Sequence, residues 1–262
     1  MSIKAYKGFN KDMTCREFKY EEGKSYKEEV AKCCNSGFHA CENPIDVFNY
    51  YDPAHSIYRE VELNGDTDKD PDDDDSKICA TEIKIGATID LPGMIKASID
   101  FVMNRVKRER SIDKDNSIVS LKSDNSCVKN SGYSSVASNS GDSSVASNSG
   151  DRSVASNSGD RSVASNSGDS SVASNSGYSS VASNSGGSSV ASTTDGNSIA
   201  VAWGQDSKAK GVKGSYLVLS EWEYIGNGKY NQIGAKMVQV DGKEVKEDTY
   251  YMLKNGKVLE VE

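Results

Sequence analysis

The chain contains 262 residues, carries a formal net charge of −8 at pH 7 and is 35% hydrophobic by residue count. This length allows one to three modest domains, and the acidic balance disfavours direct nucleic-acid binding. No apolar run approaches the roughly 20 residues that span a bilayer, and the first residues do not form a secretion signal. We therefore expect an intracellular protein without membrane contact, whose six cysteines are free thiols.

The first part of the chain, residues 1–110, is predicted to be an α+β domain. Asn43 and Pro44 form a helix start, because Asn caps a first turn and Pro suits the first helical position. Runs of alternating polar and apolar residues predict strands on both sides of this helix. The expected strands cover residues 3–6, 16–20, 38–41, 57–63 and 78–89, and Asn64-Gly65 is expected to end the fourth of them.

Two further features belong to this domain. Residues 66–75 hold seven Asp and one Lys, a net charge of −6, so we expect a solvated acidic loop. The alternative is a patch that imitates phosphate groups or binds a basic partner.

Apolar residues then recur at helical spacing from Ile95 to Val106, which predicts a helix over residues 92–108 that caps the segment after it.

A nine-residue repeat occupies residues 111–206. Its central units have the sequence Ser-Val-Ala-Ser-Asn-Ser-Gly followed by two variable residues, which predicts one short strand and one turn. Nine residues cannot enclose side chains, so we expect two units, about 18 residues, in each coil of a two-sheet β-solenoid. Ten units then give five coils, and successive units alternate between the two sheets. One aliphatic column recurs at every ninth position: Ile118, Cys127, Val136, Val145, Val154, Val163, Val172, Val181, Val190 and Ile199.

The aliphatic column also predicts which side of the strand is buried. Val, Ile and Cys fill it throughout, and Lys208 is the first polar residue that follows. We therefore expect this column to point into the solenoid, with Ser135, Ala137 and Asn139 and their equivalents on the outer face. The alternative is a disordered Ser-rich linker, but such a linker has no reason to keep a strict apolar column.

Residues 207–262 are predicted to form a β-rich C-terminal cap. Residues 215–224 alternate like a strand, and Asp241-Gly242 and Asn255-Gly256 are hairpin turn signals. A meander of four or five strands is expected to close the end of the solenoid. The fold class is therefore mainly β, with a small α+β N-terminal domain, a central two-sheet solenoid and a β-meander cap.

Several N-terminal motifs support a resemblance to a known family. They are Tyr6-Lys7-Gly8-Phe9, Phe18-Lys19-Tyr20-Glu21-Glu22-Gly23 and Gly37-Phe38-His39-Ala40-Cys41-Glu42-Asn43-Pro44. Together with the repeats that follow, they make the chain resemble an uncharacterised domain family of bacteriophages and gut-bacterial prophages. The resemblance implies a phage or prophage origin, hence the cytoplasm of a host cell, and it brings no established activity. Residues 197–211 are more weakly similar to the head repeats of trimeric bacterial adhesins.

Few residues could support enzymatic chemistry. The chain has two histidines, His39 and His55, and no Ser-His-Asp or Cys-His spacing is legible. We therefore expect a non-enzymatic protein. The alternative is an enzyme whose N-terminal order resembles the layout of ADP-ribosyltransferases, with the solenoid as a targeting rod. Its catalytic residues would be His39, Tyr50 or Tyr51, and Glu60 or Glu62.

No metal ion or other cofactor is predicted. Cys33, Cys34, His39 and Cys41 supply four nitrogen and sulfur ligands within nine residues, but their spacing is not that of a CxxC pair. Calcium is not expected in the repeats either. Asp142 and its equivalents precede the Val column by three positions, whereas calcium-binding nonapeptides place Asp two positions before it.

The turn residues of the repeats are the predicted contact surface. In an 18-residue coil, Asp124, Asp142 and Asp160 line one edge, and Tyr133, Asp151 and Asp169 line the other. Such columns could imitate a nucleic-acid backbone, which is a further alternative, although Arg152 and Arg161 adjoin them. We expect instead that the solenoid presents a rigid surface to a bacterial protein partner and that the chain inhibits a host or defence protein. Formation of homo-oligomers is a further possibility. The predicted binding residues are Tyr133, Asp142, Asp151, Asp160, Asp169 and Tyr178.

Overall fold

A computed structural model describes residues 2–53, 55–71 and 75–262 of the chain. The chain divides into two compact units, Met1–Phe101 and Val102–Glu262, which are described separately. Both are dominated by strands, so the predicted mainly-β class is confirmed. In the described part of the chain, no helix is long and apolar enough to cross a membrane.

The first unit is an antiparallel sheet in the order β4-β7-β5-β1-β6, and a further pairing of β6 with β7 closes four of these strands into a ring. A core of Phe9, Leu63, Ile83 and Ile85 fills one side of the sheet, each at most 1% exposed. A 3-10 helix, η1 (Pro44–Asn49), occupies the predicted helical segment. The strands are β1 (Ile3–Asn10), β2 (Thr14–Cys15), β3 (Phe18–Lys19), β4 (Ser25–Lys27), β5 (Phe38–Cys41), β6 (Ser56–Asp68) and β7 (Lys77–Ile89).

The strand β6 is longer than predicted. Asn64-Gly65 does not end it, because the register against β7 shifts between Asn64 and Thr67 and the strand continues beyond this irregularity. Gly65 has a φ of +76°, which glycine adopts without the steric cost that other residues meet. The predicted acidic loop over 66–75 is therefore wrong at its start, where residues 66–68 are strand. Residues 72–74 lie outside the described part of the chain.

The helix α1 (Leu91–Met103) confirms a helix in this region but not its predicted end at residue 108. Arg108–Ile112 is instead a strand, β8, which pairs in parallel with β10 over five residues. The hydrogen bonds of this pairing replace those that a longer helix would have made. The expected role of the helix as a cap stays a prediction.

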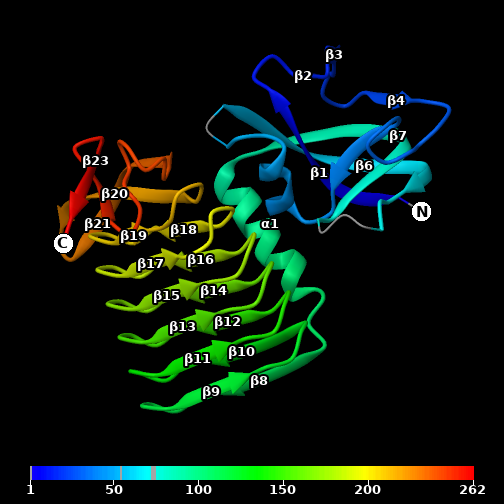
Figure 1. Ribbon diagram of the computed structural model, residues 1–262. Helices are drawn as coiled ribbons and strands as arrows, with labels where there is room; N and C mark the ends of the chain where they lie inside the picture. The colour runs from blue at the N-terminus through cyan, green and yellow to red at the C-terminus, as the bar shows by residue number, and fades with distance from the viewer. Residues whose placement is uncertain (1, 54, 72–74) are drawn as a thin grey trace. The chain divides into compact units, whose positions relative to one another are not determined.

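The second unit is a parallel β-solenoid (Figure 1). Val136 pairs with Val154 and Val145 with Val163, which confirms two repeat units per 18-residue coil and their alternation between two sheets. About six turns cover residues 108–219, so the solenoid extends beyond the predicted 111–206 at both ends. The β10 sheet contains β8, β10 (Ser126–Asn130), β12 (Val145–Asn148), β14 (Val163–Asn166), β16 (Val181–Asn184), β18 (Ile199–Ala202) and β20 (Tyr216–Gly226). The β11 sheet contains β9 (Ile118–Leu121), β11 (Val136–Asn139), β13 (Val154–Asn157), β15 (Val172–Asn175), β17 (Val190–Thr193) and β19 (Lys208–Lys210).

The predicted orientation of the repeat strands is wrong. Ala155 is fully buried and Asn157 is 2% exposed, whereas Val154 and Ser156 lie half-buried on the outer side of β13. The inward column contains Val119, Val128, Ala137, Ala146, Ala155, Ala164, Ala173, Ala182, Ala191, Ala200 and Ala209, all at most 1% exposed. The outer position accepts a charged side chain, and Lys208 accordingly pairs in register with Val190. The two outer columns differ in burial, since Val145, Val163 and Val181 of the β10 sheet are at most 2% exposed.

A coil of 18 residues encloses little space, so the interior of the central coils contains Ala and hydrogen-bonded Asn and Ser side chains, and Val119 and Val128 occupy the inward column only at its N-terminal end. The amide of Asn157 donates to the Ser144 carbonyl at 3.1 Å and to the Val163 carbonyl at 3.3 Å, and its Oδ1 accepts the Gly159 N–H at 3.3 Å. The hydroxyl of Ser171 accepts the Ser153 N–H, one coil away, at 3.0 Å. Asn and Ser ladders therefore satisfy backbone groups that the turns would otherwise leave buried and unpaired.

The glycine of each repeat is required by the stacking of the turns. A Cβ on Gly159 would lie 2.1 Å from the carbonyl oxygen of Gly141, one coil below, and seven of the other turn glycines show a similar distance. Two residues after the glycine, the chain adopts a positive φ, as at Ser143 (51°) and Ser170 (55°). These non-glycine residues pay a steric cost at every turn.

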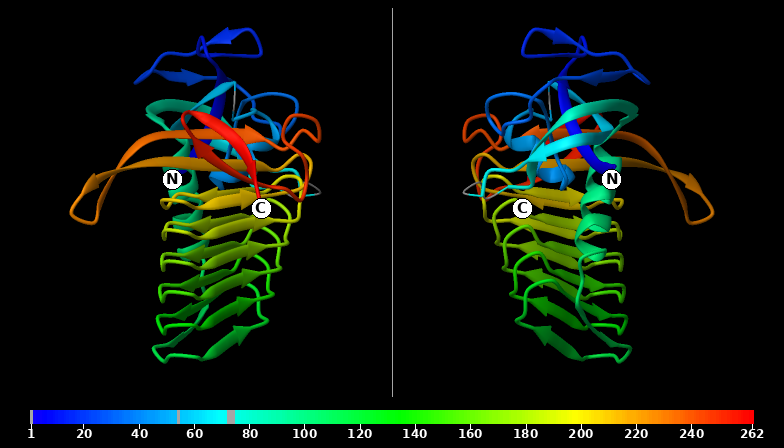
Figure 2. Two further views of the ribbon diagram at one scale, coloured as in Figure 1. Left: turned by 90° about the vertical axis from the view of Figure 1, so that its left-hand side faces the viewer. Right: turned by 90° about the vertical axis from the view of Figure 1, so that its right-hand side faces the viewer.

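Two hairpins rather than one continuous meander form the predicted β-rich cap. β20 pairs with β21 (Lys229–Gln239) and extends the β10 sheet; β22 (Tyr250–Lys254) pairs with β23 (Lys257–Val261) and extends the β11 sheet. Leu217, Leu219 and Tyr251 join Ala200 and Ala209 in one core at this end of the solenoid. The stacked coils and the long β20–β21 hairpin are seen side on in Figure 2.

Candidate functional sites

The predicted contact residues lie on the two edges of the solenoid, as expected. Asp124, Asp142, Asp160 and Tyr178 follow one edge, while Tyr133, Asp151 and Asp169 follow the other. Most of the carboxylates also have a structural role: Oδ1 of Asp142 accepts the N–H of Asp160 at 2.9 Å, and Oδ1 of Asp160 accepts that of Tyr178 at 2.8 Å. On the other edge, Asp151 accepts the N–H of Asp169 at 2.9 Å. One oxygen of each of these carboxylates is thus committed to the stack, and the charge stays at the surface.

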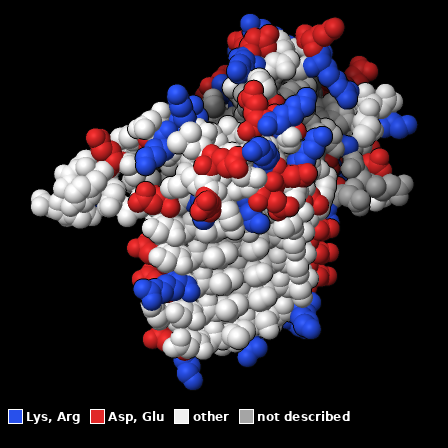
Figure 3. Space-filling view, turned by 60° about the vertical axis from the view of Figure 1, so that its left-hand side comes forward, with Lys and Arg blue, Asp and Glu red and all other residues white. Residues whose placement is uncertain are grey.

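The face between these edges carries no charge over most of its height. On the outer side of the β11 sheet, Val136, Val154 and Val172 alternate with Ser138, Ser156 and Ser174, and all six are half-buried. Figure 3 shows a broad uncharged surface over the stacked coils, with acidic groups and some basic groups along its borders. We call this surface the Val/Ser face.

A second exposed apolar surface was not predicted from the sequence. The hairpin of β20 and β21 exposes four large side chains: Tyr224 (58%), Ile225 (61%), Tyr230 (39%) and Ile233 (53%). Tyr224 and Tyr230 pack against each other with ring centroids 5.2 Å apart. The dipeptide Asn227-Gly228 is typical of a hairpin turn and could have predicted this hairpin. An apolar cluster of this kind on a projecting hairpin is typical of an interaction surface.

The first unit contains a cavity of about 560 Å³. It lies where β1 diverges from β5, since these strands share a single register pair, Tyr6 with Cys41. Aromatic side chains supply much of its wall, and cationic side chains are part of it. The polar and ionisable groups at the cavity include Lys7, Arg16, Glu28, His39, Tyr50 and Lys77.

Lys7 is the unusual residue of this cavity. It is 6% exposed, and its ammonium donates to the His39 carbonyl at 2.8 Å and lies 5.7 and 5.9 Å from the ring centroids of Phe9 and Tyr20. Among the described residues, no carboxylate forms an ion pair with it. Burial lowers the pKa of Lys7, because a charged ammonium loses its hydration there.

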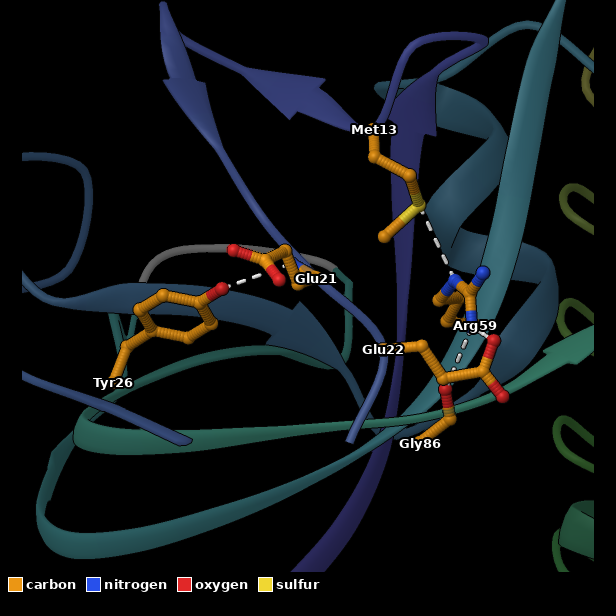
Figure 4. Close-up of polar contacts among 6 residues, drawn as sticks. All are labelled: Met13, Glu21, Glu22, Tyr26, Arg59 and Gly86. Atoms are coloured by element: carbon orange, nitrogen blue, oxygen red, sulfur yellow. Dashed lines mark hydrogen bonds and ion pairs between the residues drawn. The ribbon is translucent and has the colours of Figure 1, made fainter. Parts of the chain in front are cut away.

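The short strands β2 and β3 and the loops beside them form one wall of the cavity. Hydrogen bonds from Arg59 hold this segment against the sheet (Figure 4). Arg59 is 8% exposed and donates to Glu22 at 2.6 Å, to the Gly86 carbonyl at 3.0 Å and to the Met13 sulfur at 3.2 Å. The hydroxyl of Tyr26 accepts the Glu21 N–H at 2.8 Å. Arg16, with a φ of 47°, holds a strained backbone conformation in this wall. Such strain is common where a segment is held in place for binding.

The residues of the enzyme alternative are not gathered in one place. His39 and Tyr50 line the cavity, and Tyr51 lines it too. Glu60 and Glu62 do not; they lie beside a separate, smaller hollow, where Glu60 pairs with Lys4 at 2.9 Å. Within the described part of the first unit, neither Glu60 nor Glu62 therefore lies beside His39.

His39 is held by backbone groups on both ring nitrogens. Nε2 lies 2.9 Å from the Cys34 nitrogen and accepts its N–H, so Nδ1 carries the proton and donates to the Gly37 carbonyl at 3.0 Å. Burial, and to a smaller extent Lys7, lowers the pKa of His39 below its ordinary value. The imidazole is thus neutral near pH 7.

The structure also groups His39 with two thiols. The ligand atoms of Cys33, His39 and Cys79 all lie within 4.8 Å of one another. His39 and Cys79 are register partners on β5 and β7. The four ligands considered from the sequence, Cys33, Cys34, His39 and Cys41, include two members of this cluster. Cys79 is 46 positions beyond Cys33 in the chain, and no local motif indicates it.

Comparison with known proteins supplies a family for the first unit. Residues 3–97 match a family described as a domain of unknown function, DUF7666. No curated protein and no solved structure matches the chain. The N-terminal part of the chain therefore contains a domain of an uncharacterised family.

Proposed function

We propose that the chain is a non-enzymatic interaction protein of phage or prophage origin, whose solenoid binds a bacterial protein in the host cytoplasm. The Val/Ser face is the observation that supports this proposal. Its aliphatic column is half-buried in the folded chain, so covering it would remove further apolar area from water. The face belongs to a stack of strands with matched hydrogen bonds, and little entropy is lost when a rigid surface binds.

The borders of the face define the chemistry of the partner. Asp124, Asp142 and Asp160 stand along one border and Asp151 and Asp169 along the other, while Arg152 and Arg161 adjoin them. We expect a partner with a flat, uncharged centre and Lys or Arg residues at its rim, because carboxylates attract cations across an interface. The contact residues would include Tyr133 and Tyr178, whose side chains are 42% and 40% exposed.

Site-specific photocrosslinking in bacterial cells tests this proposal. A benzophenone amino acid replaces Ser156 on the Val/Ser face or, as a control, Lys243 in an exposed loop of the same unit. A bacterial protein crosslinked from position 156 and not from 243, and lost when Val154 and Val172 are changed to Lys, would support the proposal. Crosslinks to nucleic acid, to a second copy of this chain, or equally from position 243 would overturn it.

The buried Lys7 favours a second candidate function, the binding of a small organic anion in the cavity. A buried ammonium without a carboxylate partner is costly, and an anion would supply the missing charge. The volume of about 560 Å³ is in the range of small-molecule sites. The ligand class is a phosphate or carboxylate attached to a flat ring, which the aromatic walls would contact.

Calorimetry with adenosine monophosphate tests this second candidate. We expect binding that adenosine, which lacks the phosphate, does not match. Lys7→Met should remove it, whereas Lys4→Met, on the same strand with an exposed side chain, should retain it. Equal binding of adenosine, no binding of the monophosphate, or equal loss in both variants would overturn the proposal.

A further inference from the structure

We propose that Cys33, His39 and Cys79 form a binding site for a thiophilic divalent metal ion, with Zn²⁺ as the natural occupant. Two sulfurs and one imidazole nitrogen are the ligand types that zinc prefers, and three protein ligands leave one position for water or another exchangeable ligand. The site lies within the first unit and involves no residue of the solenoid.

The spacing of the three groups suits this ion. They lie within 4.8 Å of one another. A tetrahedral zinc ion with Zn–S bonds of about 2.3 Å holds its ligand atoms roughly 3.8 Å apart. A contraction of about 1 Å or less, well within side-chain rotation, therefore converts the observed cluster into a coordination sphere. The partnership of His39 and Cys79 across two paired strands fixes two of the three ligands on rigid backbone.

The hydrogen bonds of His39 already orient its ring as in a metal-binding histidine. The bond from His39 Nδ1 to the Gly37 carbonyl leaves the lone pair on Nε2, the arrangement that orients a metal-binding histidine. Metal binding would then exchange the Cys34 N–H for the ion at Nε2.

The cysteines that the structure places beside His39 differ from those that lie near it in the sequence, and substitutions can distinguish the two sets. A site read from the sequence would use Cys34 and Cys41, which lie close to His39 in the chain. Cys34 is exposed and outside the cluster, and Cys41 packs with Val47 and Met94 in a separate apolar group. Cys34→Ser and Cys41→Ser are therefore matched controls for Cys33→Ser and Cys79→Ser.

Cobalt titration of the full chain, purified reduced and metal-free, provides the test. Co²⁺ should bind with one equivalent and give thiolate charge-transfer absorption that Zn²⁺ abolishes. Because loss of an outer-shell partner alone costs about 10-fold to 100-fold in affinity, loss of Cys33 or Cys79 should weaken binding by roughly 100-fold or more. Cys34→Ser should leave the titration unchanged. Absent thiolate bands, or an equal loss in Cys34→Ser or Cys41→Ser, would overturn the proposal.

A measurement on the unaltered chain guards against misfolded variants. Alkylation is assigned to individual cysteines from the fragment ions of their peptides and is compared with and without Zn²⁺, because Cys33 and Cys34 lie in the same peptide. The ion should protect Cys33 at least as strongly as any other thiol, while the adjacent Cys34 should react at an unchanged rate. Equal protection of both thiols, or of neither, would contradict a site built from Cys33, His39 and Cys79.

Discussion

Replacing Asn157 by Ala tests whether the polar ladder inside the solenoid stabilises it. The substitution removes two donor contacts, to Ser144 and Val163, and leaves the buried N–H of Gly159 without its acceptor. The Ser144 carbonyl keeps a backbone partner, the Val163 N–H at 2.9 Å, so most of the cost comes from Gly159 and from the space that is left. An unsatisfied buried donor costs about 1 to 3 kcal/mol, and the lost contacts and packing raise the expected loss to about 2 to 4 kcal/mol.

The neighbouring residue Ser156 provides the matched control, because it lies on the outer side of the same strand. Ser156→Ala should change the free energy of unfolding by about 0.5 kcal/mol or less. Trp203 and Trp222, the two tryptophans of the chain, both belong to the second unit, so urea denaturation followed by tryptophan fluorescence reports its unfolding. A loss in Asn157→Ala no larger than that in Ser156→Ala would refute the assignment of Asn157 to the interior.

Three more predictions concern single residues. Gly159→Ala should destabilise the second unit by about 3 kcal/mol, because its Cβ would collide with the Gly141 backbone. Gly187→Ala should cost less than about 1 kcal/mol in the same urea assay, because its Cβ would meet only side-chain atoms, the flexible Gln205 at 3.0 Å and the Asp169 carboxylate at 3.5 Å. Ser143→Asn should raise the melting temperature, by the equivalent of about 0.5 to 1 kcal/mol, since Asn tolerates the positive φ found there; an unchanged or lower value would contradict the strain argument. Lys7→Met should slow hydrogen exchange in β1 and β5, because removal of a buried charge without an ion-pair partner stabilises the first unit by about 1 kcal/mol or more. Lys4→Met is the control, and faster exchange in Lys7→Met than in this control would show that Lys7 stabilises the fold.

The architecture of the solenoid could be predicted from its repeat, but the direction of its side chains could not be taken from one column alone. Two apolar columns run through the repeats, one of Val and one of Ala, and both alternate with polar residues. The Ala column continues through Ala209, while the Val column meets Lys208. That difference, together with the small space inside an 18-residue coil, favoured Ala as the buried residue. The larger hydrophobic side chain was the wrong guide because the interior is filled by hydrogen-bonded Asn and Ser.

The sites of the first unit were less accessible to sequence reasoning. His39 stood out as one of two histidines, and it does line the cavity and join the thiol cluster. Cys79 and Lys7 gave no local signal, because their proximity to His39 depends on the pairing of β5 with β7 and on the divergence of β1 from β5. A buried lysine looks like any other lysine in a strand. Long-range pairing of this kind is set by the whole sheet rather than by neighbouring residues.

Alkylation of engineered cysteines at two adjacent positions tests the central claim most directly. Trypsin cleavage after Arg152 and Arg161 releases a peptide of residues 153–161, so Val154→Cys and Ala155→Cys can be followed separately from the native thiols. The structure predicts rapid labelling at position 154 and strong protection at position 155 in the folded chain. Protection at 154 with rapid labelling at 155 would mean that the valines face inward and would contradict the account.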